Sequence, residues 1–587
     1  MAKQNIVKAN KDEKDKQNNK EKTISSNAKF TILAIILIAI FSFALTPITF
    51  QNDTYYTIKI GEHIQNYGID MQDPFSWHEN LSYTYPHWLY DLLTYWIYAI
   101  FNMQGIYIVT CILSIILGIS IYIVNSKITK NQILSFLITL DVMYLLKAYI
   151  TARAQLVTFI LFIWTIFFIE KFIQNKKIGY AIGLVLISIA IANLHVAVWP
   201  FYFVLYLPYI AEYLIAILGE IVFYQKAQIF FLEKRVKGIN KKLEKANEVN
   251  KTKLKLKLEN LETKLEKTKQ TADKIKIKRE KYNENPYKVK LTKNPNVKWL
   301  ILIFIICLFT GLLTPIGDTP YTYLFKTMEG NTTQNINEHL PMTLIDQIPV
   351  IITLIIFLSI LIFTKAKIKL SDLFMISGLL LLMLYSRRQL TMFALIGSVV
   401  LNRLLNDMFS RYNMDLKDKS KYFVKPAGLL FTISIVGLMS LHFYKPKIGD
   451  QYVDETQYPV DASTYILENI DLSKARLYNE YNYGSYLLFR GIPVFIDSRA
   501  DLYAPEFSGL SDDIFMDFIN TSSIGVFYED TFEKYGITHV ICFKNSKMNM
   551  IIEKTNDEHY NLLYSDDYFV VYERIVDNTN EEISENS

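Results

Sequence analysis

The side chains best suited to chemistry gather in one polar stretch, residues 52–96, which separates two apolar segments. Six carboxylates and three histidines lie in it, among many aromatic residues. Asp53 comes first, directly after the apolar run 30–50. A carboxylate at such a membrane exit can act as a general base toward a hydroxyl group. We therefore expect this stretch to form the roof of an active site with Asp53 at its centre.

A second group of charged residues stands at the ends of later apolar runs, on the same predicted side as Asp53. Charged side chains at the end of a span often only extend to the lipid interface. However, basic residues concentrate on the cytoplasmic side of membrane proteins, and paired arginines elsewhere match the geometry of a phosphate or diphosphate. The group therefore indicates a binding site, and its members are Arg153, His195, Asp318, Glu338, His339, Arg387 and Arg388.

The composition of the 587-residue chain indicates a multi-pass membrane protein. It is 51% hydrophobic with a mean hydropathy of +0.16, an average over long apolar runs and highly charged tracts. The net charge of +5 comes mainly from lysines beside the apolar runs. This placement is a topology signal, so we expect a lipid bilayer and no nucleic acid as partner. The three cysteines predict no disulfide framework.

Basic residues accumulate at alternate ends of about eleven apolar runs, which approach the length that spans a bilayer. This alternation predicts a protein of the cell membrane with a cytoplasmic N-terminus and with Asp53 outside. The segment 87–101 is amphipathic and contains Asp91, so we expect an interfacial helix there instead of a span. The predicted spans are 30–50, 106–124, 132–146, 156–172, 178–192, 199–231, 299–314, 350–363, 373–385, 391–405 and 427–443.

The predicted fold is a polytopic α-helical membrane protein with a cytoplasmic helical-hairpin insertion and a C-terminal extracytoplasmic α/β domain. The insertion is expected to turn near Asn247–Asn250, either as a solvated spacer or as a coiled coil that docks a partner. Strands of the α/β domain are expected at 476–478, 494–496, 540–543 and 568–572. The parts in order are a disordered basic tail (1–29), an N-terminal membrane module (30–232) with a first external loop (51–105), the insertion (233–298), a second membrane module (299–445), the α/β domain (446–575) and a disordered tail (576–587).

Several motifs, in this order, resemble a known family. The stretch DTYYTIKIGEHIQNYGIDMQDPFSW from Asp53 to Trp77, followed by HWLYD from His87, resembles the first external loop of bacterial GT-C glycosyltransferases. The resemblance covers most of the chain except the insertion 233–298. The later similar pieces are RAQ at Arg153, NLH ending at His195, TPIG from Thr314, INEHLP from Ile336, SRR at Ser386, YNYGSYL from Tyr481 and FIDSR from Phe495.

The resemblance implies an integral-membrane glycosyltransferase, of inverting type, that uses a polyprenyl-phosphate-linked sugar donor. Its acceptor would be an extracytoplasmic glycan, lipid or protein. Asp53 would be the general base, or a ligand of Mg²⁺ or Mn²⁺. Some relatives carry a second acid beside the first, whereas Asn52 and Thr54 flank Asp53 here, so metal dependence stays open. The resemblance further implies Asp73 and Glu338 as secondary acids, and Arg153, Arg387 and Arg388, assisted by His195, as the donor-phosphate site.

Two other function classes compete with the transferase. A transporter or flippase for a lipid-linked or small polar substrate would use an acid within a span, and Asp141 is the main candidate. A non-catalytic scaffold, which would bind partners through the coiled coil and the external domain, predicts no pocket joining Asp53 to Arg387, and placement of the two on opposite sides of the bundle would favour it. We expect His63 and His87 to be structural instead of metal-binding. Asp497 and Arg499 are expected to form an ion pair inside the C-terminal domain, with contact to the acceptor as the alternative.

Overall fold

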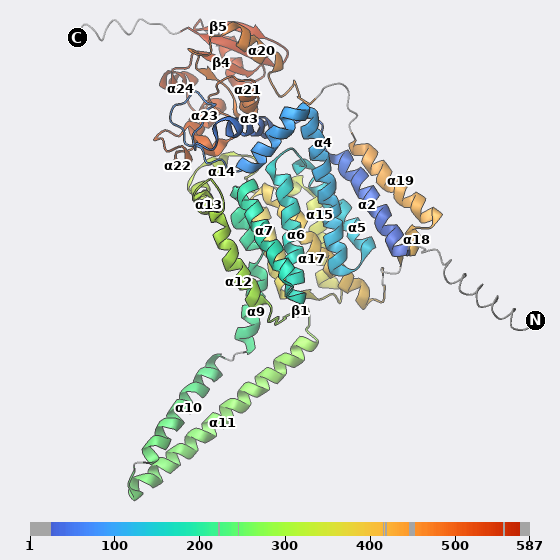
Figure 1. Ribbon diagram of the computed structural model, residues 1–587, viewed down its shortest axis with the longest axis vertical. Helices are drawn as coiled ribbons and strands as arrows, with labels where there is room; N and C mark the ends of the chain where they lie inside the picture. The colour runs from blue at the N-terminus through green and yellow to red at the C-terminus, as the bar shows by residue number, and fades with distance from the viewer. Residues whose placement is uncertain are drawn as a thin grey trace, which may run out of the picture.

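The computed structural model describes residues 25–220, 223–244, 246–414, 416, 419–444, 452–555 and 558–575. A bundle of helices forms the middle of the molecule, a long helical hairpin projects from one end, and a layer of strands and short helices covers the other end (Figure 1). The tail 576–587, and 1–24 of the tail predicted for 1–29, lie outside the described residues.

Six helical segments of the described chain are long and apolar enough to cross a membrane, and five shorter apolar helices accompany them. The prediction of a helical membrane protein is thereby confirmed, while the number of spans stays a prediction. The long segments are α2 (Ser26–Leu45), α4 (Trp88–Thr129), α6 (Ala154–Asn175), Val196–Leu218, α17 with its preceding turn (Arg387–Arg411) and α19 (Pro426–Phe443). The shorter ones are α5 (Gln132–Leu145), α7 (Ile178–Leu194), α12 (Val297–Leu308) with a short extension, α15 (Ile348–Phe363) and α16 (Leu370–Tyr385).

Helix α2 is an example of an apolar helix with one face buried in the bundle and the other face exposed. Ala34 and Ile38 are fully buried against the bundle, whereas Ile32 and Ile36 are 50% and 51% exposed on the outside. The buried face meets α4 at Gly118, where an added Cβ would come within 2.7 Å of a side chain of α2. Small residues of this kind let membrane helices approach closely, and the exposed isoleucines suit a lipid environment.

The lysine-rich ends of the apolar helices meet at one end of the bundle. The Lys171 ammonium donates to the Lys127 carbonyl (3.3 Å), and Lys290 pairs with Asp407 (3.4 Å). Two-residue strands β1 (Val289–Lys290) and β2 (Ile368–Lys369) pair in parallel at the same end. The alternation of basic residues along the sequence therefore corresponds to a real separation between the two ends.

The projecting hairpin consists of α10 (Phe223–Leu243) and α11 (Glu248–Glu284), which run side by side (Figure 1). An ion pair between Lys269 and Glu233 (2.9 Å) joins them. The turn lies just before Glu248, slightly ahead of the predicted position. The span predicted for 199–231 is wrong in its second half, because α9 (Leu207–Glu220) is the last helix of that run in the bundle and α10 belongs to the hairpin.

The C-terminal region forms a four-stranded sheet in the order β3-β4-β6-β5, with helices packed around it. Strands β3 and β4 are parallel, and the other pairs are antiparallel. The strands are β3 (Leu477–Tyr478), β4 (His539–Phe543), β5 (Tyr560–Ser565) and β6 (Phe569–Arg574). The helices of at least eight residues are α20 (Val460–Asn469), α21 (Tyr481–Phe489), α23 (Ile514–Ser523), α24 (Tyr528–Tyr535) and α25 (Lys547–Thr555).

One predicted strand, 494–496, is wrong, and β5 was missed. Val494 is fully buried, which explains the strand-like apolar pattern. Its backbone, however, bonds to the loop near residue 76, with its amide donating to Phe75 and its carbonyl accepting from Trp77. The segment thus connects the C-terminal region to the first loop of the chain instead of joining the sheet.

The stretch after α2 is largely helical, which its polar composition concealed. Helix α3 (Asn52–Tyr67) lies across the end of the bundle between the first part of α4 and α21 (Figure 1). Gly61 sits in the middle of α3, where a Cβ would lie 2.2 Å from the Asp91 carbonyl, so only glycine permits this close crossing. Helix α4 breaks at Asn102 (φ 53°), and this separates the predicted interfacial helix 87–101 from the apolar remainder.

Candidate active site

Three residues from distant segments form a row of charges at the end of the bundle beneath the C-terminal region. Arg153 Nη2 lies 2.6 Å from Asp53 Oδ2, and its Nη1 lies 3.1 Å from Glu338 Oε1. We call these residues the α3 triad. The side chains are 18%, 20% and 39% exposed for Asp53, Arg153 and Glu338, so they remain accessible from outside. The sequence analysis predicted all three as site residues, and the structure brings them together.

The residues on either side of Asp53 fix its position. The Asn52 side-chain amide donates to the Tyr481 carbonyl of the C-terminal region (2.8 Å). The Thr54 hydroxyl donates to the carbonyl of Ala152, the residue before Arg153 (3.3 Å). Asp53 itself stands in the first turn of α3, where the positive end of the helix dipole favours a carboxylate.

The paired arginines behave differently from each other. The Arg388 amide donates to the Glu338 carbonyl (2.9 Å), so this segment runs beside the triad. The Arg387 guanidinium turns away to the Pro341 carbonyl and the Thr343 hydroxyl (3.3 and 3.4 Å). Within the described part of the chain, the Arg388 guanidinium makes no hydrogen bond or ion pair. Arg388 is therefore available for an anionic ligand, whereas Arg387 fastens its own loop.

The electrostatics of this region favour the charged form of Glu338 and the neutral form of two histidines. Burial raises the pKa of Glu338, but the cations of Arg153 and Arg388 outweigh it and hold that pKa below its usual range. Burial, reinforced by Arg388, lowers the pKa of His339 to about 4. The buried His195 ring lies 3.0 Å from the Thr158 hydroxyl, and burial followed by Arg388 depresses its pKa strongly. A neutral His195 can exchange hydrogen bonds here, but it adds no positive charge for a phosphate.

A buried chain of polar groups next to the triad was not predicted. His87 Nδ1 donates to the buried Asp91 carboxylate (2.7 Å), which leaves Nε2 to accept from the Tyr56 hydroxyl (3.1 Å). Tyr56 follows Asp53 by three residues on α3, so both lie on one face of that helix. Burial, and then the charge of Asp53, raise the pKa of Tyr56 well above its usual value. The i,i+4 spacing of His87 and Asp91 was the signal in the sequence, but the prediction considered only metal binding for His87 and took it as structural.

Asp73 belongs to a different ion pair. Its carboxylate lies 2.7 Å from Arg499 Nη1, and Arg499 Nη2 lies 2.6 Å from Asp497. The two carboxylates are fully buried and the guanidinium nearly so. The expected pair within the C-terminal domain is thus present, and it extends to the first loop. The structure uses Asp73 to fasten this loop and does not add it to the α3 triad.

The charged residues of the site do not provide a set of metal ligands. Across the described ranges, no three His, Cys, Asp or Glu side chains cluster closely enough to hold a metal ion. Arg153 lies between Asp53 and Glu338, so a guanidinium already neutralises the two acids that a divalent cation would use. The donor set therefore does not fit Mg²⁺ or Mn²⁺, and no step below depends on a metal.

The geometry also bears on the two competing function classes. Asp141 is exposed on α5 instead of facing the bundle interior, which gives a transport pathway no support. Arg387 and Asp53 lie at the same end of the bundle, so the arrangement that would favour a scaffold is not found, while the scaffold hypothesis itself stays untested. Comparison of the chain with models of protein families and with curated proteins finds no match. The GT-C resemblance therefore stays a prediction based on motifs.

Proposed function

We propose that this chain is a membrane glycosyltransferase that moves a sugar from a polyprenyl-phosphate-linked donor to an acceptor hydroxyl, with Asp53 as general base. The observation that carries the proposal is the α3 triad beside the unpaired guanidinium of Arg388. A base and a free phosphate-binding cation are the two groups that this reaction needs.

The transfer has a simple balance of bonds. The acceptor oxygen attacks C1 of the sugar from the face opposite the phosphate, which inverts the configuration, while Asp53 takes the hydroxyl proton. The bond from C1 to the phosphate oxygen breaks, and its electron pair leaves with the polyprenyl phosphate. Arg388 stabilises the charge that develops on the phosphate. Arg153, paired with Asp53 and Glu338, holds the two carboxylates in place beside the phosphate.

The Tyr56–His87–Asp91 chain supports the base in this proposal. Asp91 orients the His87 ring, and His87 holds the Tyr56 hydroxyl on the face of α3 that carries Asp53. In this proposal the three side chains are positioning residues, because they set the surroundings of Asp53, whose charge adds to burial in raising the pKa of Tyr56, and do not act directly on the sugar.

The proposed topology places this chemistry outside the cytoplasm. The lysine-rich end of the bundle is assigned to the cytoplasm by the positive-inside rule, so the N-terminus is cytoplasmic and the C-terminal domain extracytoplasmic. All eleven apolar helices would then cross or enter the membrane. A lipid-linked donor suits this arrangement, since its phosphate lies at the interface where the α3 triad stands. The acceptor is an external glycan, lipid or protein.

The test measures release of polyprenyl phosphate from lipid-linked hexoses and pentoses by the full chain in nanodiscs. Asp53→Asn should reduce this release by about 10²–10⁴-fold, the usual contribution of a general base. Glu62→Gln is the matched control, because Glu62 lies on the same helix and pairs only with Lys59 among the described residues. Equal turnover of Asp53→Asn and wild type would exclude Asp53 as the base. No release from any donor would overturn the transferase itself.

A further inference from the structure

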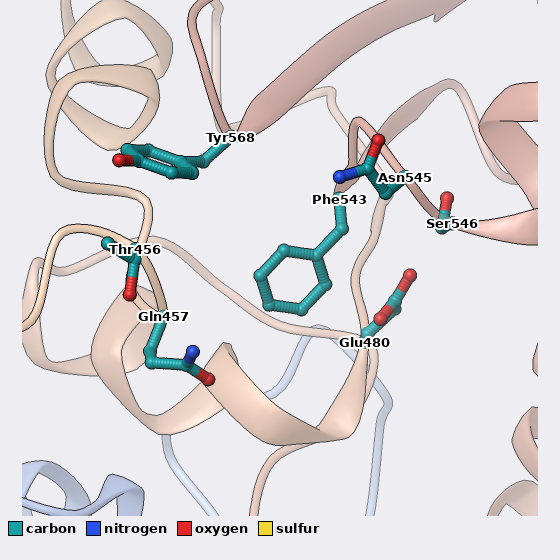
Figure 2. A pocket seen from close by; sticks show the side chains of 7 residues that line it. All are labelled: Thr456, Gln457, Glu480, Phe543, Asn545, Ser546 and Tyr568. Atoms are coloured by element: carbon teal, nitrogen blue, oxygen red, sulfur yellow. The ribbon is translucent and has the colours of Figure 1, made fainter.

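The C-terminal region contains an open pocket of about 360 Å³ that the proposed chemistry does not use. Figure 2 shows the Phe543 ring in the middle of it, with Tyr568 and Thr456 on one side and Glu480 on the other. Pockets that bind small molecules begin at roughly 300 Å³. The pocket is therefore large enough for a small ligand.

The position of the pocket in the fold is one where α/β sheets commonly bind ligands. Strand β4 ends at Phe543, and the parallel strand β3 ends two residues before Glu480. Helix α21 begins immediately after Glu480, and α25 begins immediately after Ser546. The pocket thus lies at the carboxyl ends of the two parallel strands, the usual ligand position in open α/β sheets.

The lining selects a neutral ligand with many hydroxyl groups. The seven described residues that line the pocket include no basic and no aliphatic side chain. Two rings, of Phe543 and Tyr568, offer apolar faces, and the remaining side chains offer hydroxyl, amide and carboxyl groups. Burial raises the pKa of Glu480 to about 7, so its carboxyl can donate as well as accept hydrogen bonds near neutral pH. An anion finds no cation here, and a lipid finds no apolar surface beyond the two rings.

Both walls of the pocket are fastened to the segment that carries Asp53. Tyr481, next to Glu480, accepts the hydrogen bond from Asn52 (2.8 Å). On the other wall, Tyr458, next to Gln457, donates from its hydroxyl to the Phe50 carbonyl (3.3 Å). Hydrogen bonds thus connect both walls of the pocket to residues 50–52, which directly precede the proposed base Asp53.

We infer that this pocket is a saccharide-binding subsite that holds a unit of the acceptor glycan. The assignment of the bound saccharide as the acceptor rests on the proposed transferase function. Saccharide binding itself can be measured without turnover. All seven described lining residues belong to the C-terminal region and none to an apolar helix, so a lipid-anchored donor is the less suitable occupant.

The experiment screens the full chain in detergent against an array of bacterial and neutral oligosaccharides, and then titrates the best ligand. Tyr568→Ala and Gln457→Ala should each weaken binding by about 3- to 10-fold, the effect of losing one aromatic face or one hydrogen bond. Tyr568 is 45% exposed, and its ring contacts no other described ring, so its removal should not disturb folding. Phe527→Ala is the control, because Phe527 is a similarly exposed aromatic (58%) outside the pocket.

The outcomes of these experiments distinguish a failure of the saccharide subsite from a failure of the proposed transferase function. Asp53→Asn should bind the saccharide normally while losing turnover, and Tyr568→Ala should raise the acceptor KM while leaving kcat unchanged. Three outcomes would overturn the subsite. They are equal binding of a saccharide by wild type and Tyr568→Ala, no binding of any saccharide, and stronger binding of a tri-lysine peptide than of any saccharide. Loss of binding in Tyr568→Ala with no donor turnover in wild type would support the subsite and reject the transferase.

Discussion

The bundle contains the same arrangement of charges at both ends, an arginine between two carboxylates. At the end with the C-terminal region it is the α3 triad. At the lysine-rich end, Arg403 of α17 lies 2.8 Å from Glu170 and 3.2 Å from Asp372, and we call these residues the α17 triad. Two clusters with the same components thus lie in different surroundings within one molecule.

The two triads differ in how far their side chains are exposed to solvent. The acids of the α17 triad are only 5% and 7% exposed, and Glu170 also accepts a hydrogen bond from the Tyr209 hydroxyl (2.8 Å). The acids of the α3 triad are 18% and 39% exposed, and Arg388 stands beside them without an ion-pair partner among the described residues. An enclosed triad can only hold helices together, whereas an open one with a spare cation can admit a ligand.

The largest contrast is expected in turnover. Asp53→Asn should lower donor turnover by about 10²–10⁴-fold with little change in thermal unfolding, because it removes the proposed base at an open site. Asp372→Asn should leave turnover per folded molecule near that of wild type. Turnover measured beside the unfolding temperature tests both, and equal losses in the two variants would make the open triad as structural as the closed one.

Stability should show the reverse order. Arg403→Leu leaves two buried carboxylates unpaired, which costs roughly 3–5 kcal/mol when one partner of a buried pair is removed. Arg153→Leu should cost much less, since water reaches its acids. Thermal unfolding in detergent followed by tryptophan fluorescence makes the comparison. A larger loss in Arg153→Leu would contradict the proposed difference in exposure.

The paired arginines provide a smaller effect within the open site. Arg388→Ala should raise the donor KM by about tenfold, corresponding to one lost charged hydrogen bond to phosphate. Arg387→Ala serves as control, because its guanidinium is already engaged with Pro341 and Thr343. The dependence of initial rate on donor concentration separates the two. Equal changes in the donor KM of Arg388→Ala and Arg387→Ala would contradict the proposal that only Arg388 binds the donor phosphate.

The smallest effect concerns acid stability. His339 beside the α3 triad has a folded pKa of about 4, whereas an unfolded histidine titrates near ~6.5. Between these values the unfolded chain binds the extra proton, so stability falls as the pH drops from about 6.5 to 4, by up to about 3 kcal/mol. His339→Gln should flatten this decline in unfolding temperature. An unchanged decline would assign it to groups elsewhere.

Much of the bundle could be predicted because its signals are local. Apolar length marked the helices, and alternating lysines separated the two ends, which was enough to bring Asp53, Arg153 and Glu338 to one place. The arginine pair could not be resolved in this way. Whether a guanidinium is free or engaged depends on partners such as Pro341, which contact it only after folding.

The roof over the site was less predictable because its partners are distant in sequence. The segment 494–496 resembled a strand by composition, but its backbone partners lie near residue 76. Likewise, Asp73 looked like a second acid until Arg499 supplied its charge partner. His87 was interpreted as structural instead of metal-binding because no second histidine stands at helical spacing from it, and its contact with Tyr56 on the preceding helix α3 forms only after folding.

The pairing of Asp73 with Arg499 has a consequence for how the protein is made. The two residues are separated by 426 positions, and a ribosome adding about 5–20 residues per second needs roughly 20–85 seconds to cover that distance. For most of this interval the first loop is outside the ribosomal tunnel while Arg499, its counter-ion, does not yet exist. The apolar helices, the last of which ends at Phe443, must therefore assemble beneath an unfinished cover, and this ion pair can form only after residue 499 of the 587 has been made.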